Sequence, residues 1–281
     1  MTTPMFSLEV FPPKRNAPVG TIYDTLDGLE GLHPDFISVT YGHGTQSDRT
    51  ATARIANTIR TEYGIPTVAH LTALYSDHEV IDQALDMFDK AGVTAVLALR
   101  GDELPDHERV GVFPHASDLV AYIRERRPDM KVFGACYPEG HYESASLDDD
   151  IANLKVKVDA GVTHLISQLF YDNDDFYRFL DKARAAGIDV PIEAGIMPVR
   201  GAKSVRRMAE RNASRIPARL ARLLDRWEGN AEALRAAGIN YASEQITDLV
   251  SHGVDGIHLY TMNHPGSTRR IWSNVEPLFT R

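Results

Sequence analysis

Short apolar segments alternate with longer amphipathic segments along most of the chain. The short segments are rich in β-branched residues and predict strands, whereas apolar positions spaced three and four residues apart predict helices. Eight strands are expected, at residues 6–11, 36–41, 67–73, 95–100, 131–137, 164–170, 192–197 and 256–262. Ten helices are expected, at residues 21–32, 48–63, 76–91, 117–126, 147–160, 174–186, 202–211, 218–228, 231–251 and 267–278. Strand and helix therefore alternate in eight units, with two additional helices before the last strand.

This regular alternation, without a linker or a break in composition, predicts the α/β class. We expect a single (β/α)8 TIM barrel with additional C-terminal helices, forming one catalytic domain over residues 1–281. Four expected helices end at a glycine, as a left-handed helix cap requires, at Gly64, Gly92, Gly161 and Gly187. A doubly wound sheet is the alternative, but its glycine motif would follow the first strand. The partial match at residues 42–47 follows the second strand and lacks the third glycine.

The composition is that of an ordinary folded protein. Hydrophobic residues make up 43% and charged residues 25% of the 281 residues, which excludes disordered, collagen-like and coiled-coil chains. No apolar run approaches the roughly 20 residues that cross a bilayer, and the first residues lack the pattern of a secretion signal. We therefore expect a cytoplasmic protein. The single cysteine, Cys136, excludes an internal disulfide, and its position within an expected strand indicates a core residue.

Charge is distributed unevenly along the chain. The 30 Lys and Arg against 39 Asp and Glu give a net charge of −9, which argues against a nucleic-acid partner. Residues 200–226, the basic segment, instead hold nine basic residues against only Glu210 and Asp225, a net charge of +7. The segment follows the seventh expected strand, where barrels often bind anions, so it is a candidate for attracting carboxylates or phosphates. Alternatively, these basic residues simply lie on helix faces that are exposed to water.

Polar side chains stand at the ends of most expected strands, where barrels carry their chemistry. These candidates are Glu9, Thr40, His70, Arg100, Asp102, Tyr137, His141 and Gln168. Glu9 lies between Leu8 and Val10, and burial favours the protonated form of a carboxyl group, as a general acid requires. A structural pair with an arginine such as Arg100 is the alternative. His70 is more typical of a core histidine, and the strands lack the His-x-His motif of a metal site.

One expected helix carries a polar face beside these strand ends. Asp150, Asn153 and Lys157 are spaced three and four residues apart, so they share one side of the helix at residues 147–160. That side is a candidate for ligand contact, and a solvated stripe is the alternative.

Ten ordered segments between residues 7 and 263 resemble the methylenetetrahydrofolate reductase family. They are SLEVFPPK at 7–14, SVTYG at 38–42, HLT at 70–72, ALRGD at 98–102, YPEGH at 137–141, residues 154–161, QLF at 168–170, GIMP at 195–198, RIP at 215–217 and YTMN at 260–263. The resemblance implies a TIM barrel that reduces 5,10-methylenetetrahydrofolate to 5-methyltetrahydrofolate. The implied hydride donor is NADH or NADPH, and FAD is the usual relay. The expected partners are folate and the nicotinamide dinucleotide, in a monomer or homo-oligomer without nucleic acid, membrane or metal.

The resemblance also assigns roles to residues of this chain. Glu9 is the implied general acid, Asp102 stabilises a substrate cation and Gln168 orients the pterin. Contacts to the flavin fall on Thr40, His70, Arg100, Gly101, Asp102, His115, Ala116, Tyr137, His141, Asp150, Asn153 and Lys157. Contacts to folate fall on Glu9, Asp102, Gln168, Met208, Tyr260 and His264. Opening the methylene bridge needs a proton at N10 and leaves an iminium cation at N5, which explains the acid and the fixed carboxylate.

Two positions depart from the pattern of the family. His115 stands where a tyrosine commonly lies beside the adenine of the flavin, after a long charged loop, so we expect any FAD to be lost on dialysis. His264 stands where an arginine often meets the folate glutamate, so we expect Arg200, Lys203 and Arg206 to supply part of that attraction. The family's regulatory domain is not expected, because the chain ends soon after the eighth strand.

Two other functions compete with this one. A flavin-dependent barrel of the proline dehydrogenase type would share the architecture but needs a different substrate clamp. A folate- or flavin-binding protein without catalysis is the second, and the presence of both Glu9 and Asp102 argues against it.

Overall fold

The computed structural model describes residues 3–13, 20–41, 49–103 and 107–279. The strands are β1 (Met5–Val10), β2 (Phe36–Val39), β3 (Thr67–Thr72), β4 (Ala95–Leu99), β5 (Lys131–Cys136), β6 (His164–Ser167), β7 (Ile192–Ile196) and β8 (Gly256–Tyr260). The helices are α1 (Gly20–Leu29), α2 (Arg49–Glu62), α3 (His78–Lys90), α4 (Ala116–Arg126), α5 (Leu147–Asp159), α6 (Asn173–Ala185), α7 (Ala202–Arg211), α8 (Ala218–Trp227), α9 (Ala231–His252) and α10 (Pro265–Val275). A 3-10 turn, η1 (Glu276–Leu278), follows.

The strands form a closed barrel in the order β1 to β8. This confirms the predicted (β/α)8 barrel, and α8 and α9 are the additional helices that the periodicity indicated. The four glycines expected to end helices all have positive φ, between 68° and 123°, which confirms that prediction as well. The partial glycine motif at residues 42–47 lies outside the described residues.

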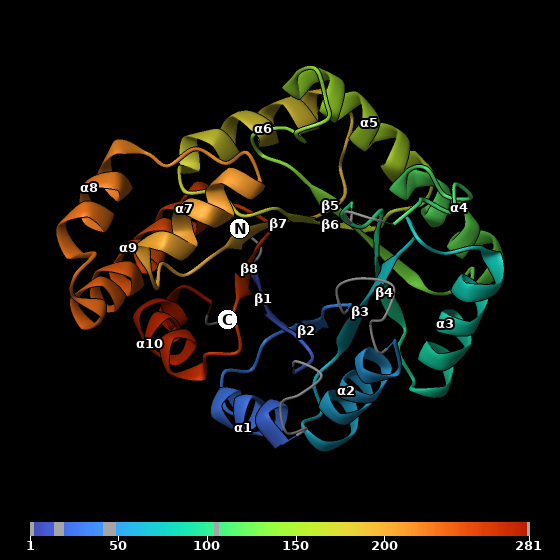
Figure 1. The fold of residues 1–281 in the computed structure, drawn as a ribbon, viewed down its shortest axis with the longest axis horizontal. Helices are drawn as coiled ribbons and strands as arrows, with labels where there is room; N and C mark the ends of the chain where they lie inside the picture. The colour runs from blue at the N-terminus through green and yellow to red at the C-terminus, as the bar shows by residue number, and fades with distance from the viewer. Residues whose placement is uncertain (1–2, 14–19, 42–48, 104–106, 280–281) are drawn as a thin grey trace. The chain divides into compact units, whose positions relative to one another are not determined.

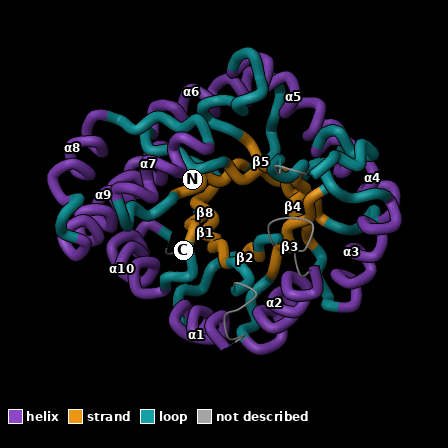
Figure 2. The backbone as a smooth tube through the Cα atoms, viewed as in Figure 1, coloured by secondary structure: helices purple, strands orange, loops and turns teal. Residues whose placement is uncertain are grey.

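Contacts between Cα atoms group the chain into two compact units. The N-terminal unit comprises Ser7–Ala135 with Val156–Leu165, and the C-terminal unit comprises Met1–Phe6, Cys136–Lys155 and Ile166–Arg281. In the N-terminal unit, β3 pairs with β2 and β4 in parallel. Figure 2 shows these three strands side by side, with α2 packed against β2 and β3.

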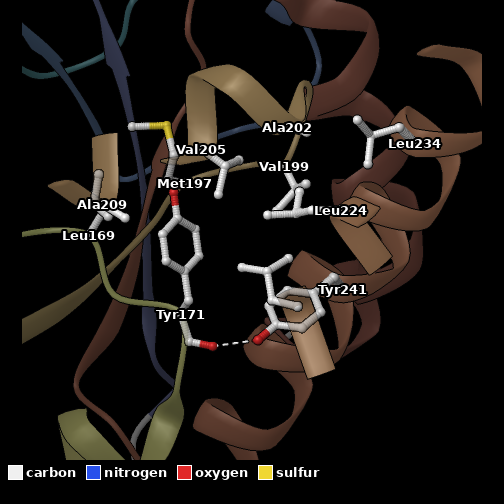
Figure 3. Packing of buried hydrophobic residues seen from close by; sticks show 11 residues of the cluster. Leu169, Tyr171, Met197, Val199, Ala202, Val205, Ala209, Leu224, Leu234 and Tyr241 are labelled. Atoms are coloured by element: carbon white, nitrogen blue, oxygen red, sulfur yellow. Dashed lines mark hydrogen bonds between the residues drawn. The ribbon is translucent and has the colours of Figure 1, made fainter. Parts of the chain in front are cut away.

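Figure 3 shows one apolar cluster of the C-terminal unit. Its buried members come from the ends of β6 and β7 and from three helices, α7, α8 and α9, which lie together in Figure 1. They are Leu169, Tyr171, Met197, Val199, Ala202, Val205, Ala209, Leu220, Leu224, Leu234 and Tyr241. Burying a Leu or Met side chain contributes about 1.5–3 kcal/mol, so this α7–α9 cluster supplies much of the stability of the unit. Within this cluster the Tyr241 hydroxyl donates a hydrogen bond to the Tyr171 carbonyl, at 2.5 Å.

Helix α9 approaches the backbone after β7 very closely. A Cβ atom at Gly238 would collide with the carbonyl oxygen of Val199 and lie 2.8 Å from its carbonyl carbon. Only glycine allows the two backbones to pack at this distance. The contact therefore sets the position of α9 against the segment that leads into α7.

Three loops of the C-terminal unit meet at Arg215. Its guanidinium group binds Asp172 at 2.8 Å and Asp175 at 2.9 Å, both near the start of α6. Its backbone N–H donates to the carboxylate of Glu139 at 2.7 Å. Asp175 is buried and also pairs with Arg178. The β5–α5 loop, the β6–α6 loop and the α7–α8 loop are thereby fastened together, and we call this group the Arg215 clasp.

The contact at Gly238 predicts whether Gly238→Ala raises or lowers the free energy of unfolding. On an open helix face, Gly238→Ala would stabilise the protein by about 1 kcal/mol through helix propensity. Here we expect the collision with Val199 to lower the free energy of unfolding by roughly 1–3 kcal/mol. Gly229→Ala is the control, because no atom lies within 4 Å of a Cβ atom there. Urea denaturation measures both variants, and a stabilised Gly238→Ala would contradict the close approach.

The Arg215 clasp gives a pH-dependent prediction. Burial raises the pKa of Glu139 above its ordinary value of 4.5 and outweighs the opposite effect of the Arg215 N–H. The folded state thus binds a proton at Glu139 more tightly than the unfolded state, so the stability that this residue contributes is full below pH 4.5 and decreases as pH rises through the folded-state pKa.

Glu139→Gln keeps an acceptor without the buried charge, and we expect its stability at pH 7 to match or exceed that of the wild type. Glu139→Ala leaves the Arg215 N–H without this acceptor and should lower the free energy of unfolding by roughly 1 kcal/mol. The measurement is denaturation at pH 4 and pH 7. Equal stability of the two variants at pH 7 would show that the hydrogen bond contributes nothing.

Candidate active site

Each compact unit carries its own group of the predicted site residues. The N-terminal unit holds Glu9, Thr40, His70, Arg100, Gly101, Asp102, His115, Ala116 and Lys157. The C-terminal unit holds Tyr137, His141, Asp150, Asn153, Gln168, Met208, Tyr260 and His264.

Glu9 and His70 form the central pair of the N-terminal group. The carboxylate oxygen Oε2 of Glu9, on β1, lies 3.5 Å from Nε2 of His70, on β3. Their side chains are only 13% and 8% exposed, and Leu8 and Val10 on either side of Glu9 are fully buried. A buried histidine in contact with a carboxyl group agrees with the core histidine that the sequence indicated. Glu9 therefore combines little contact with water and an imidazole neighbour, which suits a group that keeps or delivers a proton.

The turn after β4 presents Arg100 and Asp102. Gly101 between them has φ of +96°, and a Cβ there would come within 3.3 Å of Cβ of Thr72, so the turn favours glycine. The Arg100 carbonyl accepts hydrogen bonds from the backbone N–H groups of Ala73 and Leu74, at 3.2 and 2.8 Å. Arg100 is partly buried and Asp102 is exposed. A carboxylate on a fixed turn, open to solvent, can meet a cationic ligand without a change of backbone.

The remaining N-terminal candidates surround these strand ends. Thr40 follows β2, and its carbonyl accepts a hydrogen bond from the Thr52 hydroxyl at 3.0 Å. Lys157 donates from its ammonium group to the carbonyl of Ala135. His115 is exposed immediately before α4, and its backbone N–H donates to the carboxylate of Asp118 at 2.8 Å. Ala116 is the first residue of that helix. The His115 ring is therefore open to solvent rather than packed in the core.

In the C-terminal group, the β5–α5 loop carries two neighbouring rings. Tyr137 and His141 meet edge to face with centroids 4.7 Å apart, and Nδ1 of His141 accepts a hydrogen bond from the Glu143 N–H at 3.2 Å. The polar face expected on α5 divides: Asp150 is buried and accepts from the Ser144 hydroxyl at 2.9 Å, whereas Asn153 is exposed. Asp150 thus has a structural bond that its sequence position did not indicate.

The amide of Gln168 is oriented by the backbone. Its Oε1 accepts the N–H of Leu169 at 2.8 Å, which leaves its NH2 group as the donor available for a ligand. The Tyr260 hydroxyl donates to the Ser167 carbonyl at 2.7 Å, and a Cβ at Gly195 would lie 2.8 Å from that hydroxyl. Ser167, the residue before Gln168, is therefore held by Tyr260 of β8 and lies close to Gly195 of β7.

The other two C-terminal candidates are Met208, on α7, and His264, which precedes α10. Met208 is partly buried against the α7–α9 cluster, and His264 is exposed immediately before α10. Met262 and Asn263, just before His264, both have φ of +52°. Left-handed residues other than glycine are uncommon and often occur at functional sites. Sequence reasoning missed this turn, and the tolerance of asparagine for such a conformation was the one available signal.

Four of the nine cations of the basic segment have the following partners within the protein. Arg206 pairs with Asp225 at 2.5 Å, Arg215 belongs to the clasp, and Arg219 pairs with Glu244. The guanidinium of Arg226 lies 5.1 Å from the centroid of the Trp227 ring. These four residues thus have intramolecular partners, which the sequence alternative of solvated helix faces did not include.

Three further expectations concern chemistry and location. Cys136 is 1% exposed, which confirms its place in the core. Within residues 3–13, 20–41, 49–103 and 107–279, no three His, Cys, Asp or Glu side chains gather as metal ligands. The helices of the same ranges include none with the length and apolar character needed to cross a membrane.

The sequence matches a known family over nearly its whole length. The family model for methylenetetrahydrofolate reductase covers residues 1–276. Methylenetetrahydrofolate reductase 1 of Schizosaccharomyces pombe is 38% identical, over 95% of this chain and 45% of its own. Methylenetetrahydrofolate reductase (NADH) 1 of Arabidopsis thaliana is 37% identical, over 96% and 48%. The 5,10-methylenetetrahydrofolate reductase of Escherichia coli is 35% identical, over 92% and 86%. The chain thus spans about half the length of the first two relatives and most of the third.

Solved structures agree on the fold. An uncharacterized protein from Clostridium thermocellum that binds two copies of 5-methyl-5,6,7,8-tetrahydrofolic acid has a TM-score of 0.68, at 15% identity over 99% of this chain and 95% of its own. A dihydropteroate synthase from Coxiella burnetii, in complex with pteroic acid, has a TM-score of 0.51 at 12% identity. Identities this low show a shared fold alone. The match of the family model and the identity with the bacterial relative go further: the chain belongs to the methylenetetrahydrofolate reductase family.

Proposed function

We propose that the chain reduces 5,10-methylenetetrahydrofolate to 5-methyltetrahydrofolate, with NADH or NADPH as hydride donor and residues 1–281 acting as one catalytic domain. Family membership supports the reaction, and the name of the Arabidopsis relative, which includes NADH, supports that donor. The observation that carries the proposal is the nearly buried Glu9 carboxyl beside His70. A carboxyl group with so little exposure to water and an imidazole beside it is suited to proton transfer.

Glu9 acts as the general acid in this proposal. Cleavage of the methylene bridge breaks the bond between the bridge carbon and N10, and the electron pair of that bond stays on N10. Glu9 delivers the proton that N10 takes up, and His70 at 3.5 Å stabilises the carboxylate that remains.

Asp102 and Gln168 act after the bridge has opened. The N5 iminium carries a positive charge, and the exposed carboxylate of Asp102 on its fixed turn stabilises that charge. Gln168 donates from its NH2 group to the pterin and holds the ring for hydride transfer to the iminium carbon. Met208, Tyr260 and His264 are the further substrate contacts of the proposal.

FAD is the cofactor that the family implies, and the chain fits it in part. Thr40, Arg100, Gly101 and Lys157 offer donors and a close backbone approach, and Tyr137 and His141 offer ring faces. His70, Asp102, Asp150 and Asn153 are the other polar groups assigned to it. At the start of α4, the exposed His115 and the partly buried Ala116 form no enclosed surface for an adenine ring among the described contacts. When bound, FAD would relay the hydride from the nicotinamide, and we propose that it is held loosely.

The function is tested by the absorption spectrum of dialysed protein and by NADH oxidation with and without methylenetetrahydrofolate. We expect oxidation that depends on the folate, with proline inactive as a control substrate. Intersecting initial-rate plots without a flavin band would indicate direct transfer, since both ligands are then bound together. Parallel plots with a flavin band that survives dialysis would contradict loose binding. Absence of folate-dependent oxidation, with or without added FAD, would overturn the function.

The role of Glu9 is tested by Glu9→Gln. An amide cannot deliver the proton to N10, so we expect kcat to fall by about 100-fold or more, the usual effect of losing a general acid. The folate should still bind, because the amide has the shape of the carboxyl group. Isothermal titration calorimetry measures that binding, and Glu9→Asp, which keeps an acid, is the matched comparison. Near-normal turnover of folded Glu9→Gln would remove Glu9 from the mechanism.

A further inference from the structure

Arg200 is a cation of the basic segment that forms no ion pair with the residues described by the structure. It lies between β7 and α7, and its side chain is partly buried. Its Nε atom is buried and has no hydrogen-bond partner among the described residues. A buried N–H group without an acceptor is unfavourable, and more so when it belongs to a charged group. Arg206, Arg215 and Arg219, in the same segment, all have carboxylate partners.

A second arginine lies beside Arg200. Gly238 of α9 packs directly on the backbone of Val199, the residue before Arg200. Arg235 precedes Gly238 by three residues, so it stands on the same face of α9, one turn away. Arg235 is exposed and forms no ion pair within the described part of the chain. Burial, followed by the positive charge of Arg235, lowers the pKa of Arg200. The tight contact at Gly238 therefore holds two like charges near each other.

The start of α7 adds to this positive field. Gly201 caps the helix without a side-chain hydrogen bond, and the first turn contains no acidic residue. The N-terminus of a helix carries a partial positive charge, and acidic side chains are usually favourable there. Lys203, in the first turn, is exposed and adds another cation. An anion at this place would meet favourable charge from α7 and α9 together.

We propose that Arg200 and Arg235 form a binding site for a carboxylate or phosphate group of a ligand. Two guanidinium groups can bind one such group through parallel N–H donors, and partial burial strengthens the attraction. The anion would supply the acceptor that Nε of Arg200 lacks and remove the repulsion between the arginines. The identity of the ligand rests on the proposed function, which offers two sources of this chemistry. They are the glutamate tail of the folate and the phosphates of the dinucleotide.

The site is tested first with inorganic phosphate and glutarate as probes, using isothermal titration calorimetry on the full chain. We expect both anions to bind the wild type, and Arg200→Gln and Arg235→Gln each to weaken binding by roughly 5-fold or more. Arg222→Gln is the matched control, because Arg222 is an exposed residue of α8 in the same segment and its loss removes the same charge. It should change affinity by less than about 2-fold. Circular dichroism checks that each variant is folded.

Two results would overturn the proposal. The first is that the wild type binds neither anion. The second is an equal loss of affinity in all three variants, because that would indicate attraction by the net charge of the protein. Neither result depends on catalysis. Phosphate binding that Arg200→Gln abolishes, in a protein without reductase activity, would contradict the proposed function and support the site.

The second arm separates the two sources by direct binding. If the site takes the folate tail, Arg200→Gln and Arg235→Gln should weaken binding of triglutamyl methylenetetrahydrofolate more than that of the monoglutamate, and leave NADH binding unchanged. If it takes a dinucleotide phosphate, NADH or NADPH binding should fall and the two folates should be affected equally. Unchanged affinity for every one of these ligands would overturn a role of the site in the proposed reaction.

Discussion

The cost of placing a charged group on a buried strand is the constraint on which this site depends. Strands of a parallel barrel are apolar on both faces, so a carboxyl group within one needs either a partner or an opening to solvent. Glu9 has His70 at 3.5 Å and an exposed fraction of 13%. Glu193 on β7 likewise has a histidine partner, His258 on β8. Its Oε2 lies 3.9 Å from Nδ1 of His258, and both side chains are fully buried. The two pairs differ in exposure, since Glu193 and His258 have no contact with solvent, whereas Glu9 and His70 keep a small exposed fraction.

Rigid backbone then fixes the polar groups that solvent can reach. Asp102 is exposed, but its turn has a left-handed glycine and two hydrogen bonds to the Arg100 carbonyl. Gln168 is oriented by the N–H of Leu169. The loop that carries Tyr137 and His141 also carries Glu139, which the Arg215 clasp ties to the α7–α8 loop. Such preorganisation matters because a group that is already in place loses no energy to rearrangement when charge develops on the substrate.

The basic segment shows how tertiary contacts redistribute a charge that looks uniform in the sequence. Arg206, Arg215 and Arg219 are neutralised by carboxylates that come from other parts of the chain or from the next helix. Arg200 is placed by the close contact between Gly238 and Val199, beside another arginine and away from any described carboxylate. Ion pairs therefore compensate some cations of residues 200–226 and not others, a difference that the sequence alone does not show.

The sequence by itself determined the elements of this protein and the positions of its polar strand ends. Hydrophobic periodicity is a property of consecutive residues, so the strands, the helices and the glycines at Gly64, Gly92, Gly161 and Gly187 were predictable. Tertiary structure alone decided the partners. Glu9 meets His70 of β3, and Arg215 reaches Glu139 across 76 residues of sequence. Periodicity fixes which face of an element is buried, whereas a partner depends on which distant side chain the packing brings to that face.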